Sequence, residues 1–268
     1  MPVKKPSLKQ SPAPQRRAPA KLSSAKAAAI TIPATLPRPR GASKAMQAVR
    51  ARKTLVRAAG SALIEEIFAR FQKALPEPKG ELEYVNPFTL LVAVVLSAQA
   101  TDVGVNKATR PLFKIADTPQ KMLALGEEKV REYVKTIGLY RTKAKNVVEL
   151  SRLLIERHGG EVPPDRDALV QLPGVGRKTA NVVLNMAFGH ETMAVDTHIF
   201  RLANRLRLAP GRTPEAVEAG LEKRVPGPYR LHSHHWLILH GRYVCKALRP
   251  ECERCVIADL CTSSDKRL

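Results

Sequence analysis

The chain has 268 residues, 44% of them hydrophobic, which is enough for one or two domains with a hydrophobic core. Its 45 lysines and arginines against 24 acidic residues give a net charge of +21, which predicts a polyanionic partner, either nucleic acid or an anionic membrane surface. The longest apolar run, Leu90–Leu96, is far shorter than the roughly 18 residues of a membrane span, and no signal peptide is visible. We therefore expect neither an integral membrane protein nor an ordinary secreted one.

The positive charge is concentrated at the N-terminus. Residues 1–58 contain 14 lysines and arginines and no acidic residue, so +14 of the +21 lies there, with eight of the 21 prolines. Such a segment buries too little apolar surface to offset the entropy of ordering, so residues 1–40 are predicted to be disordered. Residues 42–58 could form a basic helix. An electrostatic arm on DNA, an organelle transit peptide and a solvated extension all fit this tail.

Helical patterns dominate from Leu63 onward, and alternating β patterns are nearly absent. The segment 87–98 is apolar on all sides, and its length favours a buried central helix. The predicted fold is all-α, with short helices around that buried one. An amphipathic helix is expected from Leu63 that ends before Pro76, and further helices over 87–98, 102–113, 119–125, 127–137 and 142–157. Breaks are expected at Pro111, Gly126, Gly138 and Gly159–Gly160.

The sequence LPGVG at residues 172–176 separates two predicted helices. Its two glycines can adopt backbone torsion angles that other residues rarely adopt, and they place no side chain between the backbone and a ligand. The next helix begins at once, so its free N–H groups and positive dipole end favour an anion such as a phosphate. A plain turn between helices has the same pattern, but the net charge of the chain favours a phosphate site.

All four cysteines fall near the C-terminus with the spacing C-x6-C-x2-C-x5-C: Cys245, Cys252, Cys255 and Cys261. Because nothing indicates secretion, disulfides are not expected, and four thiolates within 17 residues predict a metal site. Zinc sites of this class usually pair two C-x2-C hairpins, whereas uneven spacing suits a larger cubane. The spacing alone leaves zinc and an iron–sulfur cluster open.

Several segments together resemble one family of DNA-repair glycosylases. LPGVGRKTA is similar to the helix-hairpin-helix motif of the endonuclease III family. The segments SAQATD, VNKAT, IGLYRTKA, VDTHIFR and HHWLILHGRY resemble the same family in the same order. The resemblance extends from about Leu63 to the C-terminus, and the basic tail has no counterpart in it.

The resemblance implies an architecture and a cofactor. It implies two helical domains that flank a DNA-binding cleft, a six-helix domain over 81–190 and a discontinuous domain of 60–80 with 191–268. It also implies a 4Fe-4S cluster held by the four cysteines. Basic residues of this loop, Lys246 among them, would contact the DNA backbone.

The resemblance assigns catalytic roles to Lys178 and Asp196. A lysine in the first turn of a helix opposes the dipole, which favours the uncharged, nucleophilic amine, although a solvated surface lysine fits the same pattern. Asp196 precedes an apolar helical run and could be an ordinary N-cap. By resemblance, the Lys178 amine attacks C1′ of the sugar and forms a Schiff base, and Asp196 stabilises the developing positive charge and assists proton transfer.

The implied enzyme is a DNA glycosylase and abasic-site lyase that flips oxidised pyrimidines out of duplex DNA and cleaves the strand by β-elimination. We expect a monomer in the cytoplasm, at the nucleoid, and the tail leaves organellar targeting open. An adenine-mismatch glycosylase fits less well, because Lys178 is present and the chain ends seven residues after Cys261. A non-catalytic DNA-binding or redox-sensing iron–sulfur protein is the other alternative. The residues expected to contact DNA are Gln99 (filling the gap of the flipped base), Leu139 (wedging into the opposite strand), Leu172, Gly174, Val175, Gly176 and Arg177.

Overall fold

The computed structural model describes residues 58–267, and within this range every regular element is a helix. The all-α prediction is therefore confirmed. The basic tail over 1–58, including the helix considered for 42–58, lies outside the described residues apart from Ala58. None of the described helices combines the length and the apolar character needed to cross a membrane.

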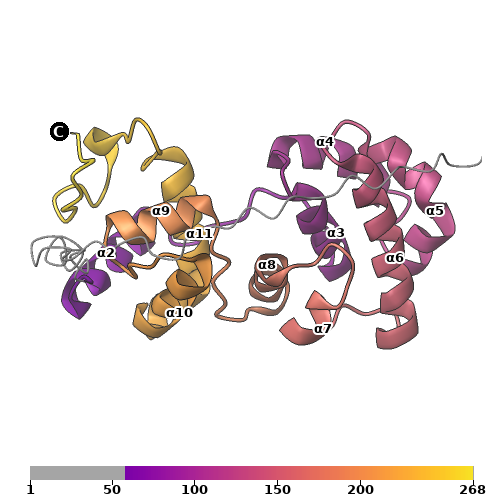
Figure 1. Ribbon diagram of the computed structural model, residues 1–268, viewed down its shortest axis with the longest axis horizontal. Coiled ribbons are helices and arrows are strands. Elements are labelled where there is room, and N and C mark those ends of the chain that lie inside the picture. The colour runs from indigo at the N-terminus through magenta and orange to yellow at the C-terminus, as the bar shows by residue number, and fades with distance from the viewer. Residues whose placement is uncertain (1–57, 268) are drawn as a thin grey trace, which may run out of the picture. The chain divides into compact units, whose positions relative to one another are not determined.

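The helices follow one another with short connections (Figure 1). In chain order they are α2 (Ser61–Ala74), α3 (Pro87–Ser97), α4 (Asp102–Phe113), α5 (Pro119–Val134), α6 (Tyr140–His158), α7 (Arg166–Val170), α8 (Arg177–Phe188), α9 (Thr197–Arg205), α10 (Pro214–Arg224) and α11 (Arg230–Tyr243), with the short 3₁₀ turns η1 (Gly227–Tyr229) and η2 (Cys252–Arg254).

The buried helix α3 begins at a complete capping box. The Asn86 side chain accepts a hydrogen bond from the Thr89 backbone N–H at 2.8 Å, and the Thr89 hydroxyl accepts one from the Asn86 N–H at 3.0 Å. Pro87 occupies the first helical position, where its missing N–H costs nothing. Every residue from Phe88 to Leu96 is buried, which confirms the predicted central helix.

Two predicted boundaries are wrong. The break expected at Gly126 is present, because Gly126 has φ +78° between the two helical stretches of α5, but the second stretch ends at Val134 and not at residue 137. Pro111, expected as a break, lies inside the last turn of α4. Leu112 and Phe113 are buried beyond it, so their packing holds the helix past the proline, since tertiary contacts override local preference.

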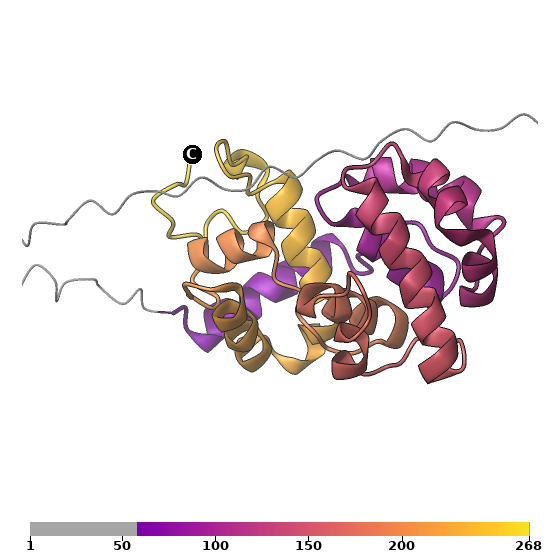
Figure 2. The same ribbon diagram turned by 45° about the vertical axis from the view of Figure 1, so that its right-hand side comes forward.

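The hydrophobic residues form two separate clusters. The first surrounds α3 and takes in residues of α4–α8, and the second joins α2 with α9, α10, α11 and the segment up to Ile257. Figures 1 and 2 show these two groups of helices, with the C-terminal segment beside α9 and α11. The members of each cluster lie within one of the two predicted domains. The domain division stays a prediction, and the clusters support it.

Polar contacts join the two clusters. Asn185 of α8 donates to the Leu231 carbonyl at 3.0 Å, and Arg242 of α11 bonds Asp102 of α4 at 2.5 Å. Arg242 also pairs with Glu81, in the segment between α2 and α3. These contacts fix the ends of α4, α8 and α11 against one another, and a cavity lies between those ends.

Candidate active site

The hairpin at 172–176 turns its side chains inward and its glycines outward. Leu172 and Val175 are 2% and 6% exposed and belong to the first hydrophobic cluster, and the Leu172 carbonyl accepts from the Val175 N–H at 3.1 Å. Gly174 and Gly176 are exposed, and Gly176 is the N-cap of α8 without a side-chain cap. The hairpin therefore presents bare backbone and a helix N-terminus, while Leu172 and Val175 anchor it.

The two glycines differ in their surroundings. Gly174 has φ +80°, and a Cβ there would lie 2.9 Å from the Asn146 side chain and 3.1 Å from that of Val95. Gly176 has no atom within 4 Å of a Cβ position and an ordinary negative φ. Gly174 is therefore required by the fold of the hairpin, whereas Gly176 is open toward a ligand.

Lys178 and Asp196 line the same cavity of about 300 Å³. Lys178 is the second residue of α8 and is exposed. Asp196 is the N-cap of α9, where its Oδ1 accepts from the His198 and Ile199 N–H groups at 2.9 and 2.8 Å. The fold thus brings together two residues from different helices, in a cavity at the lower end of the usual size of small-molecule sites.

The walls of this cavity include side chains that the sequence did not single out as functional. Arg242 and Asp102 form one wall, and His234 and His235 of α11 form another. The motif HHWLILHGRY contains three of these four residues, but its helical spacing indicates packing alone. Trp236 of the same motif is buried, and its indole donates to the Leu75 carbonyl at 2.7 Å.

The histidine pair is uncharged at neutral pH. Burial, then the charges of His235 and Lys178, lowers the pKa of His234 to about 3. Burial, then the charge of His232, lowers the pKa of His235 to about 4. Both Nδ1 atoms are buried without a hydrogen-bond partner among the described residues. These imidazoles therefore add no positive charge beside the Lys178 amine.

Gln99 and Leu139 lie on adjacent loops in the same unusual conformation. Their φ angles are +55° and +58°, and a Cβ on Gly138 would lie 3.7 Å from the Gln99 carbonyl oxygen. Both side chains are exposed, and Gln99 also lines the cavity. Positive φ is uncommon for residues other than glycine and gathers at functional sites. The two residues expected to enter the DNA therefore lie next to each other, and that role stays a prediction.

Arg177 and Lys246 are both paired with acidic side chains. The Arg177 guanidinium donates to Glu218 of α10 at 2.7 and 3.0 Å, and the Lys246 ammonium pairs with Glu251. Glu218 raises the pKa of Arg177. The expected contacts of Arg177 and Lys246 with DNA stay predictions, and any such contact has to compete with these ion pairs.

The four cysteines line a second, small cavity and form no disulfide. In the part of the chain that the structure describes, no group of three or more possible ligands is gathered around a single-ion position. Burial raises the pKa of Cys245 and of Cys255, so a stable thiolate there requires positive charge beside it. Four half-buried thiols around one cavity fit an iron–sulfur cluster, in which each sulfur binds a different iron.

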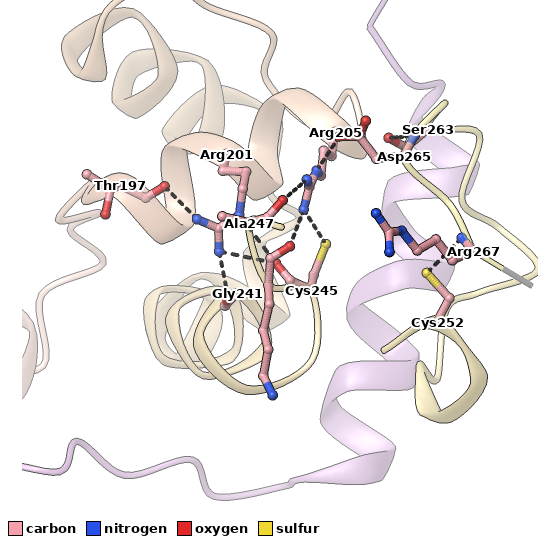
Figure 3. Close-up of polar contacts among 11 residues, drawn as sticks. Thr197, Arg201, Arg205, Gly241, Cys245, Ala247, Cys252, Ser263, Asp265 and Arg267 are labelled. Atoms are coloured by element: carbon pink, nitrogen blue, oxygen red, sulfur yellow. Dashed lines mark hydrogen bonds and ion pairs between the residues drawn. The ribbon is translucent and has the colours of Figure 1, made fainter. Parts of the chain in front are cut away.

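Nitrogen atoms lie close to three of the four sulfur atoms, and Figure 3 shows the contacts of Cys245 and Cys252. The Arg205 guanidinium lies 3.6 Å from Cys245 Sγ, and the Arg267 backbone N–H donates to Cys252 Sγ at 3.3 Å. His240 Nε2 lies 3.5 Å from Cys255 Sγ. Such contacts to sulfur are typical of iron–sulfur sites, where they stabilise the charge of the thiolates.

The helix that begins at Asp196 also holds the cysteine loop. Arg201 of α9 donates to the carbonyls of Gly241 at 2.6 Å and Cys245 at 3.1 Å. Arg205, one turn on, donates to the carbonyls of Lys246 at 2.6 Å and Ala247 at 2.8 Å (Figure 3). The two arginines of α9 thereby supply hydrogen-bond donors to the backbone carbonyls around Cys245.

Comparison with protein families assigns both parts of the site. Residues 92–227 match the HhH-GPD superfamily of base excision DNA repair proteins. Residues 245–261, from the first cysteine to the last, match the iron–sulfur binding domain of endonuclease III. The second match decides between zinc and iron–sulfur, which the cysteine spacing leaves open.

Individual relatives are similar over most of the described chain. The chain is 58% identical over 201 residues to endonuclease III of Escherichia coli K12, covering 75% of this chain and 95% of that one. It is 57% identical over 202 residues to endonuclease III of Treponema pallidum, covering 75% and 96%.

Solved structures give the same result. A trapped endonuclease III–DNA covalent intermediate matches with a TM-score of 0.71 and 44% identity, over 76% of this chain and 96% of that one. A thermostable thymine-DNA glycosylase matches with a TM-score of 0.64 and 26% identity, over 77% and 96%. With these similarities and the cysteine site, the chain belongs to the endonuclease III family of HhH-GPD base excision DNA repair proteins, and is a DNA glycosylase and abasic-site lyase that carries a 4Fe-4S cluster.

Proposed function

We propose that this enzyme removes oxidised pyrimidines such as thymine glycol from duplex DNA and cleaves the resulting abasic site through a Schiff base at Lys178. The observation that carries the proposal is that Lys178 and Asp196 line one cavity. An amine and a carboxylate that line one cavity are the two groups that displacement of a base and imine chemistry need.

In the proposed reaction the Lys178 amine attacks C1′ of the deoxyribose, a nitrogen–carbon bond forms, and the base leaves with the electrons of the glycosidic bond. The departing base takes up a proton from water, and the ammonium formed at C1′ gives up its proton to Asp196. Asp196 passes this proton to O4′ as the C1′–O4′ bond breaks, which opens the sugar ring and leaves a protonated imine at C1′. Loss of a proton from C2′ then expels the 3′ phosphate and breaks the strand. Because His234 and His235 are neutral, they add no charge repulsion to the cationic iminium.

Asp196 has two tasks in this scheme. Its Oδ1 is used in capping α9, which holds the carboxylate in place. Its second oxygen is available to stabilise positive charge on the sugar and to assist proton transfer from the amine.

The backbone of the hairpin and the N-terminus of α8 would bind phosphates of the DNA. Gln99 would fill the space of the flipped base, and Leu139, 60% exposed, would wedge into the opposite strand. Cys245, Cys252, Cys255 and Cys261 would be the four ligands of the cluster. When bound, the cluster cross-links the C-terminal loop, and the proposed chemistry needs no electron from it.

Borohydride trapping tests the proposal. The holoenzyme is mixed with a duplex that bears thymine glycol, and in parallel with an abasic-site duplex, and is then reduced. We expect a covalent protein–DNA adduct with both, which disappears in Lys178→Ala. Lys79 is the matched control, because this exposed lysine lines the same cavity.

An adduct that survives in Lys178→Ala, or that is absent instead in Lys79→Ala, would overturn the assignment of the nucleophile. An adduct with the abasic duplex but not with thymine glycol would leave the lyase chemistry standing and overturn the proposed lesion. Chromatography of the same preparation, alone and on DNA, checks the expected monomer.

A further inference from the structure

Glu218 of α10 is a buried carboxylate that receives several donors. The residue is 5% exposed, and its oxygens accept from Arg177 Nη2 at 2.7 Å and from Arg177 Nε at 3.0 and 3.1 Å. The guanidinium of Arg166, on α7, lies 3.6 Å away. Two planar cations thus face one buried acid, in an arrangement that fixes direction as well as distance.

A second set of contacts leads from Glu218 toward Asp196. The buried Asn181 amide donates to Glu218 Oε1 at 3.1 Å and to the Met193 carbonyl at 3.1 Å. The Asn181 backbone carbonyl in turn accepts from the Thr192 hydroxyl at 2.7 Å. Residues 192 and 193 belong to the non-helical segment that leads to Asp196, so Asn181 holds this segment to α8, and Glu218 fixes the amide of Asn181.

Arg177 and Asn181 flank Lys178 on α8. Arg177 is the preceding residue, and Asn181 lies three positions after Lys178, one turn along the helix. Both donate to Glu218, so the backbone that carries Lys178 is held to α10 immediately before and one turn after that residue. Removal of the Glu218 carboxylate removes the partner of both Arg177 and Asn181 at once.

We propose that Glu218 is a positioning residue for the reaction, which sets the placement of the Lys178 amine relative to the Asp196 carboxylate. Glu218 is absent from the residues that line the cavity, and it acts through Arg177 and Asn181. The proposal rests on the roles proposed above for Lys178 and Asp196. Displacements of about 1 Å at a reacting group can slow a reaction about a hundredfold. The loss of the Glu218 contacts should therefore change the reaction rate by a measurable amount.

The charge of Glu218 has a second consequence at the same place. Arg177 stands in the first turn of α8, where a cation opposes the positive end of the helix dipole. The Glu218 carboxylate neutralises that cation. This explains why an arginine is tolerated beside the nucleophile.

The first test is Glu218→Gln, which keeps the volume and the acceptor but removes the charge. In single-turnover cleavage of an abasic-site duplex by saturating holoenzyme, we expect a rate constant reduced by roughly tenfold or more. The Kd for a duplex with a non-cleavable tetrahydrofuran site should stay unchanged. A merely structural role would lower the fraction of active enzyme, seen as a smaller amplitude, without changing the rate constant.

Arg177→Met tests the pair from its other side. The Arg177 side chain is 52% exposed, but its loss leaves the buried Glu218 with Arg166, 3.6 Å away, as its remaining cation, so the visible absorbance of the cluster and thermal unfolding must confirm that the variant is folded. We expect the same slower rate constant and no additional slowing in the double variant, because both changes remove one interaction. If Arg177 instead contacts a DNA phosphate, Arg177→Met should weaken DNA binding and reduce the salt dependence of that binding. In that case Glu218→Gln should leave the affinity for DNA unchanged or increase it.

Glu215→Gln is the control, since Glu215 lies on the same helix, is exposed and makes no hydrogen bond to Arg177. Wild-type rate constants in Glu218→Gln and Arg177→Met would overturn the positioning role, provided that the wild-type adduct still depends on Lys178. If the adduct does not depend on Lys178, the proposed function itself fails, and the two failures are thereby told apart.

Discussion

At the scale of single residues, the histidines beside Lys178 make stability depend on pH. The pKa values of His234 and His235, about 3 and about 4, lie below the ordinary value of 6.5. Between about pH 6.5 and pH 4 the unfolded chain therefore binds protons that the folded protein does not. The free energy of unfolding falls as the pH falls through this range, by about 1.4 kcal/mol per pH unit for each fully affected histidine.

We expect His235→Gln to flatten this dependence, because it removes one of the imidazoles that bind a proton only in the unfolded chain over this pH range. Urea unfolding of the holoenzyme at pH values from 7 to 4.5 measures it, with the visible absorbance of the cluster followed in parallel. The exposed His190, replaced by glutamine, serves as control and should leave the slope unchanged. An equal slope in wild type and His235→Gln would mean that the imidazole is solvated or paired in solution.

At the scale of the element, the two glycines of the hairpin should separate folding from binding. Gly174→Ala places a Cβ against Asn146 and Val95 in a backbone with φ +80°, so we expect a loss of stability of about 1–3 kcal/mol. Gly176→Ala meets no atom of the protein and has no positive φ, so stability should change little.

The same Gly176→Ala change adds a methyl group where a phosphate would approach the α8 N-terminus. We therefore expect weaker binding of an abasic-analogue duplex in a protein that melts like the wild type. Thermal unfolding and fluorescence anisotropy of both variants make the comparison. Wild-type affinity in Gly176→Ala would argue against phosphate binding at this turn.

At the scale of the whole molecule, the basic segment over 1–58 carries +14 of the net charge of +21. If this segment binds DNA, its removal should flatten the plot of the logarithm of the DNA association constant against the logarithm of the salt concentration. The slope should become less negative by about 0.9 for each phosphate that the segment neutralises. Anisotropy titrations at several salt concentrations, with the full chain and with a chain that begins at Ala58, give the two slopes. Equal slopes would assign the tail another role, such as targeting.

Much of the local structure was predictable from the sequence, because it depends on neighbours along the chain. The predicted limits of 102–113 coincide with α4, and the buried helix is misplaced by one residue at its end. Asp196 is the N-cap that its position before an apolar run suggested. The break at Gly126 was predicted correctly, whereas the helical Pro111 was missed, because the burial of Leu112 and Phe113 beyond it depends on tertiary packing.

The sequence by itself determined the all-α fold, the glycine hairpin and the spacing of the four cysteines. Helix periodicity, capping side chains and glycine torsions act within a few residues, so a single sequence displays them. The tertiary structure alone decided that Lys178 and Asp196 share a cavity, that Gln99 and Leu139 adjoin, and that Arg177 binds Glu218, 41 positions away. Such pairings follow from how whole helices pack, and no local pattern in the chain specifies which distant side chains will meet.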